Sequence, residues 1–173
     1  MKSLVTGGAG FIGSNLVDKL VKLGHKVIVI DNEYSDVHEQ FYYNEKAEYH
    51  NLDIRDEATR NLYDDVDYVF HLAAEARIQP AVLNPIEAVS INSVGTCTVL
   101  QFAREAKVKR VIYSSTSSGY GLNEPPNVEA QPDDCLNPYS VSKVNGEKLC
   151  SMYTNLFGVK TIILRYFNVY GNR

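Results

Sequence analysis

The segment that decides the fold lies close to the amino terminus and reads Leu4-Val5-Thr6-Gly7-Gly8-Ala9-Gly10-Phe11-Ile12-Gly13. An apolar strand candidate precedes the glycines, and an amphipathic stretch, residues 12–23, follows them. Glycines in this spacing allow a tight turn, a close approach of backbone amides to a pyrophosphate, and close packing of helix on strand. The segment therefore predicts a dinucleotide-binding turn, with the positive end of a helix facing the phosphates.

Asp31 follows the next apolar run, Val27-Ile28-Val29-Ile30, and stands 18 positions after Gly13. A carboxylate at the end of the second strand accepts hydrogen bonds from both hydroxyls of an adenosine ribose, and it repels a 2′-phosphate. We therefore expect NAD rather than NADP as the cofactor. The alternative interpretation is a glycine turn that binds nothing, beside a surface aspartate.

Short apolar runs alternate with amphipathic stretches along the whole chain. We expect strands at residues 4–5, 27–30, 49–52, 68–70, 110–113 and 161–164, and helices at residues 12–23, 57–63, 86–106 and 139–157. The strands are apolar without a period of two, as expected where helices cover both faces of a sheet. Alternation of strands and helices implies right-handed crossovers. The prediction is a single α/β domain over residues 1–173, with a doubly wound, parallel sheet of the Rossmann type in three layers.

Further candidate cofactor contacts follow the predicted third and fourth strands. Asp53-Ile54 comes after residues 49–52, and Leu72-Ala73-Ala74 comes after residues 68–70. Ligands of open α/β folds bind at the carboxyl edge of the sheet, where these segments meet. Ordinary packing at strand ends is the alternative. Two irregular stretches, 33–48 and 119–137, are also expected to be functional loops.

Composition excludes several classes of protein. With 45% hydrophobic residues, 22% charged residues and a net charge of −4, the chain is typical of a globular domain. It has no long basic run for nucleic acid and no run of 18 apolar residues for a membrane span. Cys97, Cys135 and Cys150 lack the paired spacing of zinc sites and disulfide frameworks, so we expect reduced thiols and no metal. The early first strand leaves no room for a signal peptide, which favours a soluble, cytoplasmic protein.

Tyr139 and Lys143 are the candidate catalytic pair. They stand four residues apart in a predicted helix, so both side chains point from one face. A nearby ammonium favours the phenolate and adapts a tyrosine to proton transfer. Thr116 lies in the hydroxyl-rich segment directly after the fifth predicted strand, at the edge where ligands bind, and can hydrogen-bond a substrate alcohol. The alternatives are an exposed helical pair and a polar strand end with self-bonded hydroxyls.

Together, in this order, the motifs resemble the extended short-chain dehydrogenase/reductase family. The resemblance is to its NAD-dependent sugar-nucleotide epimerase/dehydratase branch, and within that branch most of all to UDP-glucose 4-epimerases. The matching segments span the chain: Thr6-Gly7-Gly8-Ala9-Gly10-Phe11-Ile12-Gly13, Asp53-Ile54-Arg55-Asp56, His71-Leu72-Ala73-Ala74, Asn92-x-x-Gly95-Thr96, Ser114-Ser115-Thr116, Tyr120-Gly121, Pro138-Tyr139-Ser140-Val141-Ser142-Lys143, Gly146-Glu147 and Leu164-Arg165-Tyr166-Phe167-Asn168-Val169-Tyr170-Gly171.

The resemblance implies a role for each matching residue. Tyr139 is the general base or acid, Lys143 is its electrostatic partner and Thr116 is the triad hydroxyl. The implied substrate contacts are Thr116, Tyr139 and Asn168. With the glycines of the turn, the expected cofactor contacts are Gly7, Gly10, Phe11, Ile12, Gly13, Asp31, Asn32, Asp53, Ile54, Leu72, Ala73, Ala74, Asn92, Ser114, Tyr139, Lys143 and Tyr166.

The implied reaction is the 4-epimerisation of a UDP-hexose. Bound NAD takes a hydride from the sugar C4 while Tyr139 takes the hydroxyl proton, and the hydride returns to the other face of a transient 4-keto sugar. Sugar 4,6-dehydratases of this branch carry Asp-Glu after the threonine, where this chain has Ser117 and Ser118. Ala76 stands where many 4-epimerases have a lysine that contacts the cofactor, and Arg77, one position on, is the alternative candidate for that contact.

The resemblance also has implications for the substrate-binding domain and for oligomerisation. The family carries a further C-terminal stretch that supplies most of the substrate pocket, so we expect the substrate-binding domain to be absent from this chain. It also implies a homodimer through the predicted helices 86–106 and 139–157. Two alternatives to epimerisation stay open: an NAD-binding module without catalysis, and a nucleotide-sugar decarboxylase or reductase on the same scaffold.

Overall fold

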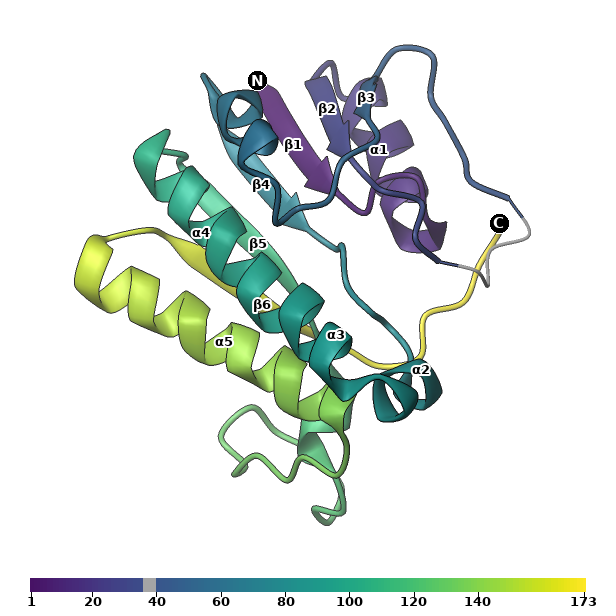
Figure 1. The fold of residues 1–173 in the computed structure, drawn as a ribbon, viewed down its shortest axis with the longest axis vertical. Coiled ribbons are helices and arrows are strands. Elements are labelled where there is room, and N and C mark those ends of the chain that lie inside the picture. Colours follow the sequence, from purple (N-terminus) through teal and green to yellow (C-terminus); the bar gives the residue numbers. More distant parts are fainter. Residues whose placement is uncertain (36–39) are drawn as a thin grey trace.

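The computed structural model describes residues 1–35 and 40–173 and contains a six-stranded parallel sheet (Figure 1). The strand order is β3-β2-β1-β4-β5-β6, which is the order of a dinucleotide-binding doubly wound fold. The strands are β1 (Lys2–Thr6), β2 (Lys26–Ile30), β3 (Glu48–His50), β4 (Tyr68–His71), β5 (Arg110–Thr116) and β6 (Thr161–Tyr166). The predicted Rossmann-type fold is confirmed.

Helical segments connect all consecutive strands except β2 and β3, between which the described residues 31–35 and 40–47 are irregular. The α-helices are α1 (Phe11–Lys22), α2 (Ile78–Leu83), α3 (Pro85–Val89), α4 (Gly95–Glu105) and α5 (Pro138–Phe157). Two 3₁₀ segments, η1 (Glu57–Tyr63) and η3 (Ser117–Tyr120), and one π-helical turn, η2 (Ser90–Val94), complete the helical elements of the described residues. In Figure 1, α1 lies at the β1–β2 side, while α4 and α5 run side by side over β4, β5 and β6.

The sheet separates two hydrophobic cores, because neighbouring residues of a strand point to opposite faces. Val5 and Val29 pack with Val17 and Leu20 of α1 on one face. The larger core lies on the other face, where Leu4, Ile28, Val69 and Val111 from the strands pack with Val99, Leu100, Phe102 and Ala103 of α4 and Cys150 and Tyr153 of α5. The strands carry apolar side chains on both faces, as the sequence pattern predicted.

Helix α5 has clear signals at both ends. Its N-cap, Asn137, accepts a hydrogen bond from the backbone N–H of Ser140, and Pro138 occupies the first turn, where a missing N–H costs nothing. The helix ends at Gly158, which has a φ of 72°. These signals fix the register of α5, and therefore which of its residues face the sheet.

Several elements differ from the sequence-based expectation. The predicted helix 86–106 is interrupted by the π-helical turn η2, and the additional short helix α2 precedes it. The third strand covers Glu48–His50 rather than 49–52, and β5 extends to Thr116, which places that residue inside the strand. Of the predicted loop 33–48, residues 36–39 lie outside the described part of the chain.

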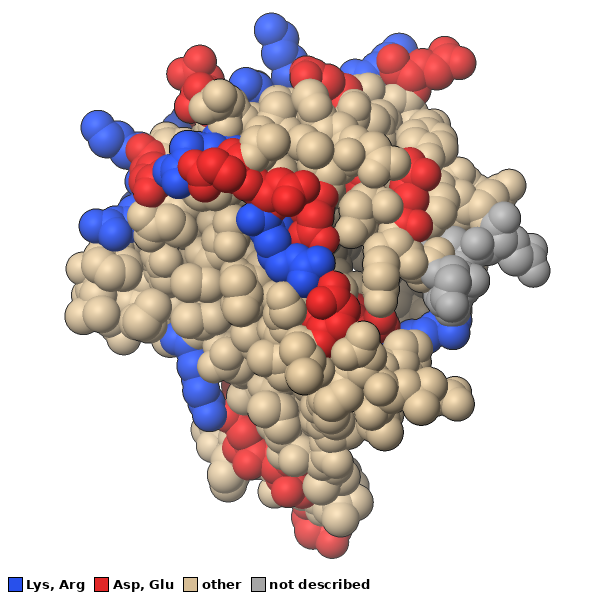
Figure 2. All heavy atoms as spheres, in the orientation of Figure 1, with Lys and Arg blue, Asp and Glu red and all other residues tan. Residues whose placement is uncertain are grey.

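Positive and negative side chains are interspersed on the face that Figure 2 shows, without an extended patch of one sign. Acidic side chains gather at the bottom of the view, over the segment 121–137. Within residues 1–35 and 40–173, every helix is too short or too polar to cross a membrane.

Candidate cofactor and active site

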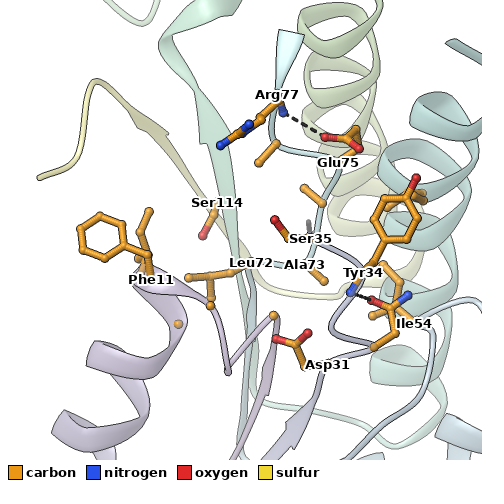
Figure 3. A pocket seen from close by; sticks show the side chains of 18 of the residues that line it. Phe11, Asp31, Tyr34, Ser35, Ile54, Leu72, Ala73, Glu75, Arg77 and Ser114 are labelled. Atoms are coloured by element: carbon orange, nitrogen blue, oxygen red, sulfur yellow. Dashed lines mark hydrogen bonds between the residues drawn. The ribbon is translucent and has the colours of Figure 1, made fainter. Parts of the chain in front are cut away.

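A cleft of about 790 Å³ lies at the carboxyl edge of the sheet, where the loops after β1 and β4 diverge to opposite sides (Figure 3). This divergence is the point at which open α/β sheets bind ligands, and the volume is in the range of small-molecule sites. The lining residues come from the β1–α1 turn, the ends of β2, β4, β5 and β6, the segment after β3, and α5.

The glycine turn packs so closely against neighbouring backbone that side chains would not fit there. Gly7 has a φ of +70°, and a Cβ there would lie 2.7 Å from the backbone nitrogen of Ala73. A Cβ on Gly13 would overlap the carbonyl oxygen of Gly7. Helix α1 begins after Gly10, and no described side chain caps its first turn. The N–H groups of that turn are therefore directed to the cleft and suit an anionic group.

Asp31 lies directly after β2 on the wall of the cleft, near the bottom of the view in Figure 3. Its Oδ2 accepts the N–H of Ala9 at 2.9 Å, and its Oδ1 accepts the N–H of Glu33 at 2.9 Å. The carboxylate therefore holds the backbone of the glycine turn at Ala9. Each oxygen keeps capacity for another hydrogen bond, as a ribose hydroxyl requires.

Asp53 lies on the same side of the cleft and is held by Arg55. The guanidinium contacts both carboxylate oxygens, with Nε–Oδ1 at 2.9 Å and Nη2–Oδ2 at 2.7 Å. Arg55 also binds Glu87 of α3 and Ser90 of η2. The Arg55 hydrogen bond lowers the pKa of Asp53, so its carboxylate stays charged and fixed beside Ile54.

Tyr139 and Lys143 stand one turn apart on α5, and both line the cleft. Lys143 is only 3% exposed, and its Nζ lies 4.4 Å from the ring centroid of Tyr113. Burial lowers the pKa of Lys143 to about 8, against smaller opposing contributions from Cys150 and Glu147. A lysine with this pKa is still mostly protonated at neutral pH, and its ammonium can stabilise a nearby phenolate.

A buried network of hydrogen bonds connects β1, β4 and α4 next to the cleft. The Thr6 hydroxyl contacts His71 Nδ1 at 2.7 Å, and His71 Nε2 contacts the Thr96 hydroxyl at 2.9 Å. Thr6 Oγ1 also accepts the N–H groups of Leu72 and Ala73, each at 3.2 Å. The Thr96 hydroxyl donates its proton to the carbonyl of Asn92 and therefore accepts a hydrogen bond from His71. This assigns the ring proton of His71 to Nε2. Burial, and then the Lys143 charge, lower the pKa of His71 to about 3, so the imidazole is neutral.

The structure brings most of the sequence-predicted residues to this one cleft. The residues on its wall are Gly7, Gly10, Phe11, Ile12, Gly13, Asp31, Asn32, Asp53, Ile54, Leu72, Ala73, Ala74, Ser114, Tyr139, Lys143 and Tyr166. Three predicted site residues do not line it: Asn92, Thr116 and Asn168.

Each of the three has a different environment. Asn92 differs from the expectation because its buried amide bonds both backbone groups of Glu75 and the hydroxyl of Ser142, which fastens the wall of the cleft to α5. Thr116 is 6% exposed and accepts the N–H of Ser118 with its hydroxyl. Asn168 is exposed beyond β6.

Some lining residues were outside the predicted set. Glu75 and Arg77 directly continue the Leu72-Ala73-Ala74 segment, and Ser115 directly follows Ser114, so proximity in sequence was the available signal. Tyr34 and Phe41 come from the irregular segment after β2, Pro80 comes from the short helix α2, and none of the three belongs to a motif. Their position depends on chain paths that the sequence pattern does not specify.

The residues present fit a dinucleotide. The glycine turn forms a cradle that side chains would fill, the uncapped start of α1 offers N–H donors, and Asp31 offers acceptors at the end of β2. Asp53 is fixed close by, and Tyr139 and Lys143 line another part of the same cleft. This is the donor and acceptor set that an NAD molecule requires.

Comparison with known proteins agrees with the geometry. A sequence model of the NAD dependent epimerase/dehydratase family matches residues 3–173. The chain is 40% identical to a putative UDP-glucose 4-epimerase of Methanocaldococcus jannaschii, over 98% of this chain and 56% of that protein. It is 38% identical to a UDP-N-acetyl-alpha-D-glucosaminuronate decarboxylase of Bacillus cytotoxicus, over 99% and 56%.

A solved structure supports the same assignment. The chain superposes on the UDP-glucose 4-epimerase of Thermotoga maritima, solved with UDP-glucose, with a TM-score of 0.92 and 37% identity, over 99% of this chain and 57% of that one. The chain thus spans little more than half the length of the relatives it matches. Its fold, its cleft and its sequence agree with one assignment: the chain belongs to the NAD dependent epimerase/dehydratase family.

Proposed function

We propose that this domain binds NAD in the cleft and, as part of a nucleotide-sugar enzyme, catalyses the 4-epimerisation of a UDP-hexose. The observation that carries the proposal is the single cleft that unites the glycine turn, Asp31 and the Tyr139–Lys143 pair. The family supplies the cofactor class, and the similarity to UDP-glucose 4-epimerases favours the substrate class.

Different residues of the cleft bind different parts of the dinucleotide. The start of α1 holds the pyrophosphate with backbone N–H groups, and Asp31 accepts the hydroxyls of the adenosine ribose. Asp53, fixed by Arg55, and Ile54 border the adenine. Ala73 and Ala74, which are small, let the dinucleotide lie close to the backbone after β4.

Proton transfer is assigned to Tyr139. The nicotinamide, when bound, supplies the hydride chemistry at the sugar C4. Tyr139 accepts the proton of the C4 hydroxyl on its phenolic oxygen and returns it later, and the Lys143 ammonium stabilises the phenolate. Thr116 is proposed to hydrogen-bond the same sugar oxygen, and Asn168 to contact the nucleotide.

Decarboxylation of a nucleotide-linked uronic acid is the second candidate. A relative at 38% identity carries the name of such a decarboxylase. Dehydration is disfavoured, because Ser117 and Ser118 offer no acid and base after Thr116. A module that binds NAD without catalysis is the remaining alternative.

The test uses the chain as it stands, with NAD bound. We expect NAD to bind and UDP-glucose and UDP-galactose to interconvert slowly, with a parallel assay for carbon dioxide release from UDP-glucuronate. Tyr139→Phe should retain NAD binding and lose turnover by at least about a hundredfold. Tyr170→Phe, at a 94% exposed tyrosine, is the matched control. Bound NAD without turnover of any UDP-hexose would contradict the epimerase assignment.

We also propose a homodimer through α4 and α5. These helices lie side by side, and apolar side chains on and beside them are exposed, among them Val94 at 54% and Val141 at 50%. Pairing would remove this apolar surface from water. Light scattering tests the proposal, and a monomeric mass at micromolar concentration would contradict it.

A further inference from the structure

Arg77 is a cation of the cleft that the proposed roles do not use. It ends the segment between β4 and α2, lines the cleft, and has an exposed side chain. Its backbone N–H donates to Glu75 Oε1 at 3.2 Å, but its guanidinium has no acidic partner among the described residues. By contrast, Arg55, Arg60, Arg165 and Arg173 all form ion pairs.

The position of the guanidinium separates it from the adenosine end of the cleft. Figure 3 shows the side chain extending from the segment after β4 toward the end of β5, where Ser114 lies, while Asp31 lies at the opposite end of the view. Ser114 belongs to the strand end that precedes the candidate substrate hydroxyl of Thr116. Arg77 therefore lies at the end of the cleft expected to receive the sugar nucleotide.

Charge also distinguishes this residue. Of the described residues that line the cleft, the cationic ones are Arg77 and Lys143, and Lys143 is almost completely buried beside Tyr113. A guanidinium keeps its charge at all accessible pH values and offers a planar fork of N–H donors that matches two oxygens of a phosphate. Arg77 is thus the exposed, permanent positive charge of the lining.

We propose that Arg77 binds the diphosphate of the nucleotide-sugar substrate. The inference rests on the proposed function, and it names a contact for the substrate within this domain. The dinucleotide has its own phosphate-binding element at the start of α1, so Arg77 is available to a second diphosphate. A diphosphate of any nucleoside satisfies this contact, so Arg77 contributes affinity without selecting the base.

Calorimetric titration of the chain saturated with NAD tests the proposal. The probes are UDP, GDP, dTDP and UDP-glucose, with uridine as the phosphate-free control. We expect Arg77→Gln to weaken the binding of the preferred nucleoside diphosphate at least tenfold and to leave uridine and NAD within twofold. Arg77→Lys should recover part of the loss, because it restores charge without the fork. Arg110→Gln, at the amino edge of the sheet, is the control for loss of one exposed arginine charge.

The outcomes separate the inference from the proposed function. Equal affinity of the unmodified and Arg77→Gln chains for the diphosphates would overturn the inference. A loss confined to NAD and ADP-ribose would also overturn it, and would assign Arg77 to the cofactor. If the unmodified chain binds NAD but none of the nucleoside diphosphates, the inference fails while NAD binding stands. If NAD does not bind, the proposed function itself fails.

Discussion

Arg165 of β6 and Glu147 of α5 form a bidentate ion pair between the helix and the sheet, with Nη2–Oε2 at 2.6 Å and Nε–Oε1 at 2.9 Å. Both side chains are nearly buried, at 13% and 12% exposure. Glu147 also accepts the hydroxyl of Ser115, and Arg165 reaches Asp133 at 2.7 Å. The pair therefore joins α5, the ends of β5 and β6, and the segment 121–137.

Arg165→Met should destabilise the fold strongly. The substitution leaves a nearly buried carboxylate on Glu147 without its cation, and breaking such a pair costs about 3 kcal/mol. Urea denaturation followed by circular dichroism measures the change. Lys109→Met, which breaks the exposed pair with Asp67, is the control and should cost less than about 1 kcal/mol. Equal effects of the two substitutions would contradict the assigned role of the buried pair.

Stability should fall in acid because of His71. Burial holds the folded-state pKa of this imidazole at about 3, below the 6.5 of an exposed histidine. Below pH 6.5 the unfolded chain therefore binds a proton on His71, while the folded chain does not. The free energy of unfolding then decreases as pH falls from 6.5 toward 3, by up to about 1.4 kcal/mol per pH unit. His71→Gln should flatten this dependence. Denaturation curves of both chains at pH 7.5 and 5.0 provide the measurement, and parallel losses would refute the assignment.

Lys143→Met should stabilise the fold at pH 7 and abolish turnover. Burial lowers the folded-state pKa of Lys143 from 10.5 to about 8, so the charged form disfavours folding at neutral pH. Its removal should raise the free energy of unfolding by up to about 3 kcal/mol, and this gain should shrink as pH rises from 8 to 10.5. Lys160→Met, at an exposed lysine, is the control for both measurements. A destabilised Lys143→Met chain at pH 7 would count against the burial argument.

Asp31→Asn should weaken NAD binding and reduce discrimination against NADP. The neutral amide loses charge-assisted hydrogen bonds to the ribose hydroxyls, which contribute about 1.5–3 kcal/mol, and no longer repels a 2′-phosphate. We expect a loss of at least about tenfold for NAD, with NADP less affected. Fluorescence titration with both dinucleotides measures the ratio. Asp65→Asn, at an exposed residue with a φ of 59°, controls for the lost charge. An unchanged ratio would remove Asp31 from the specificity argument.

The sequence predicted the sheet and most residues of the cleft, because both depend on local patterns. Gly7 to Gly13 need only their own spacing to form a turn, and Tyr139 and Lys143 need only a helix to share a face. The π-helical turn at Ser90–Val94 was missed, because its amino acids are compatible with an ordinary helix. Asn92, in that turn, was expected at the cofactor but bonds Glu75 and Ser142 instead.

The amino-acid sequence by itself determined the order of strands and helices, the glycine turn after β1 and the four-residue spacing of phenol and ammonium, since each follows from short-range backbone and periodicity rules. Tertiary structure alone decided that Lys143 is buried, that His71 is neutral, that Glu147 contacts Arg165 and that the guanidinium of Arg77 has no acidic partner among the residues described. Those properties depend on water exclusion and on contacts between residues distant along the chain, which no local pattern encodes.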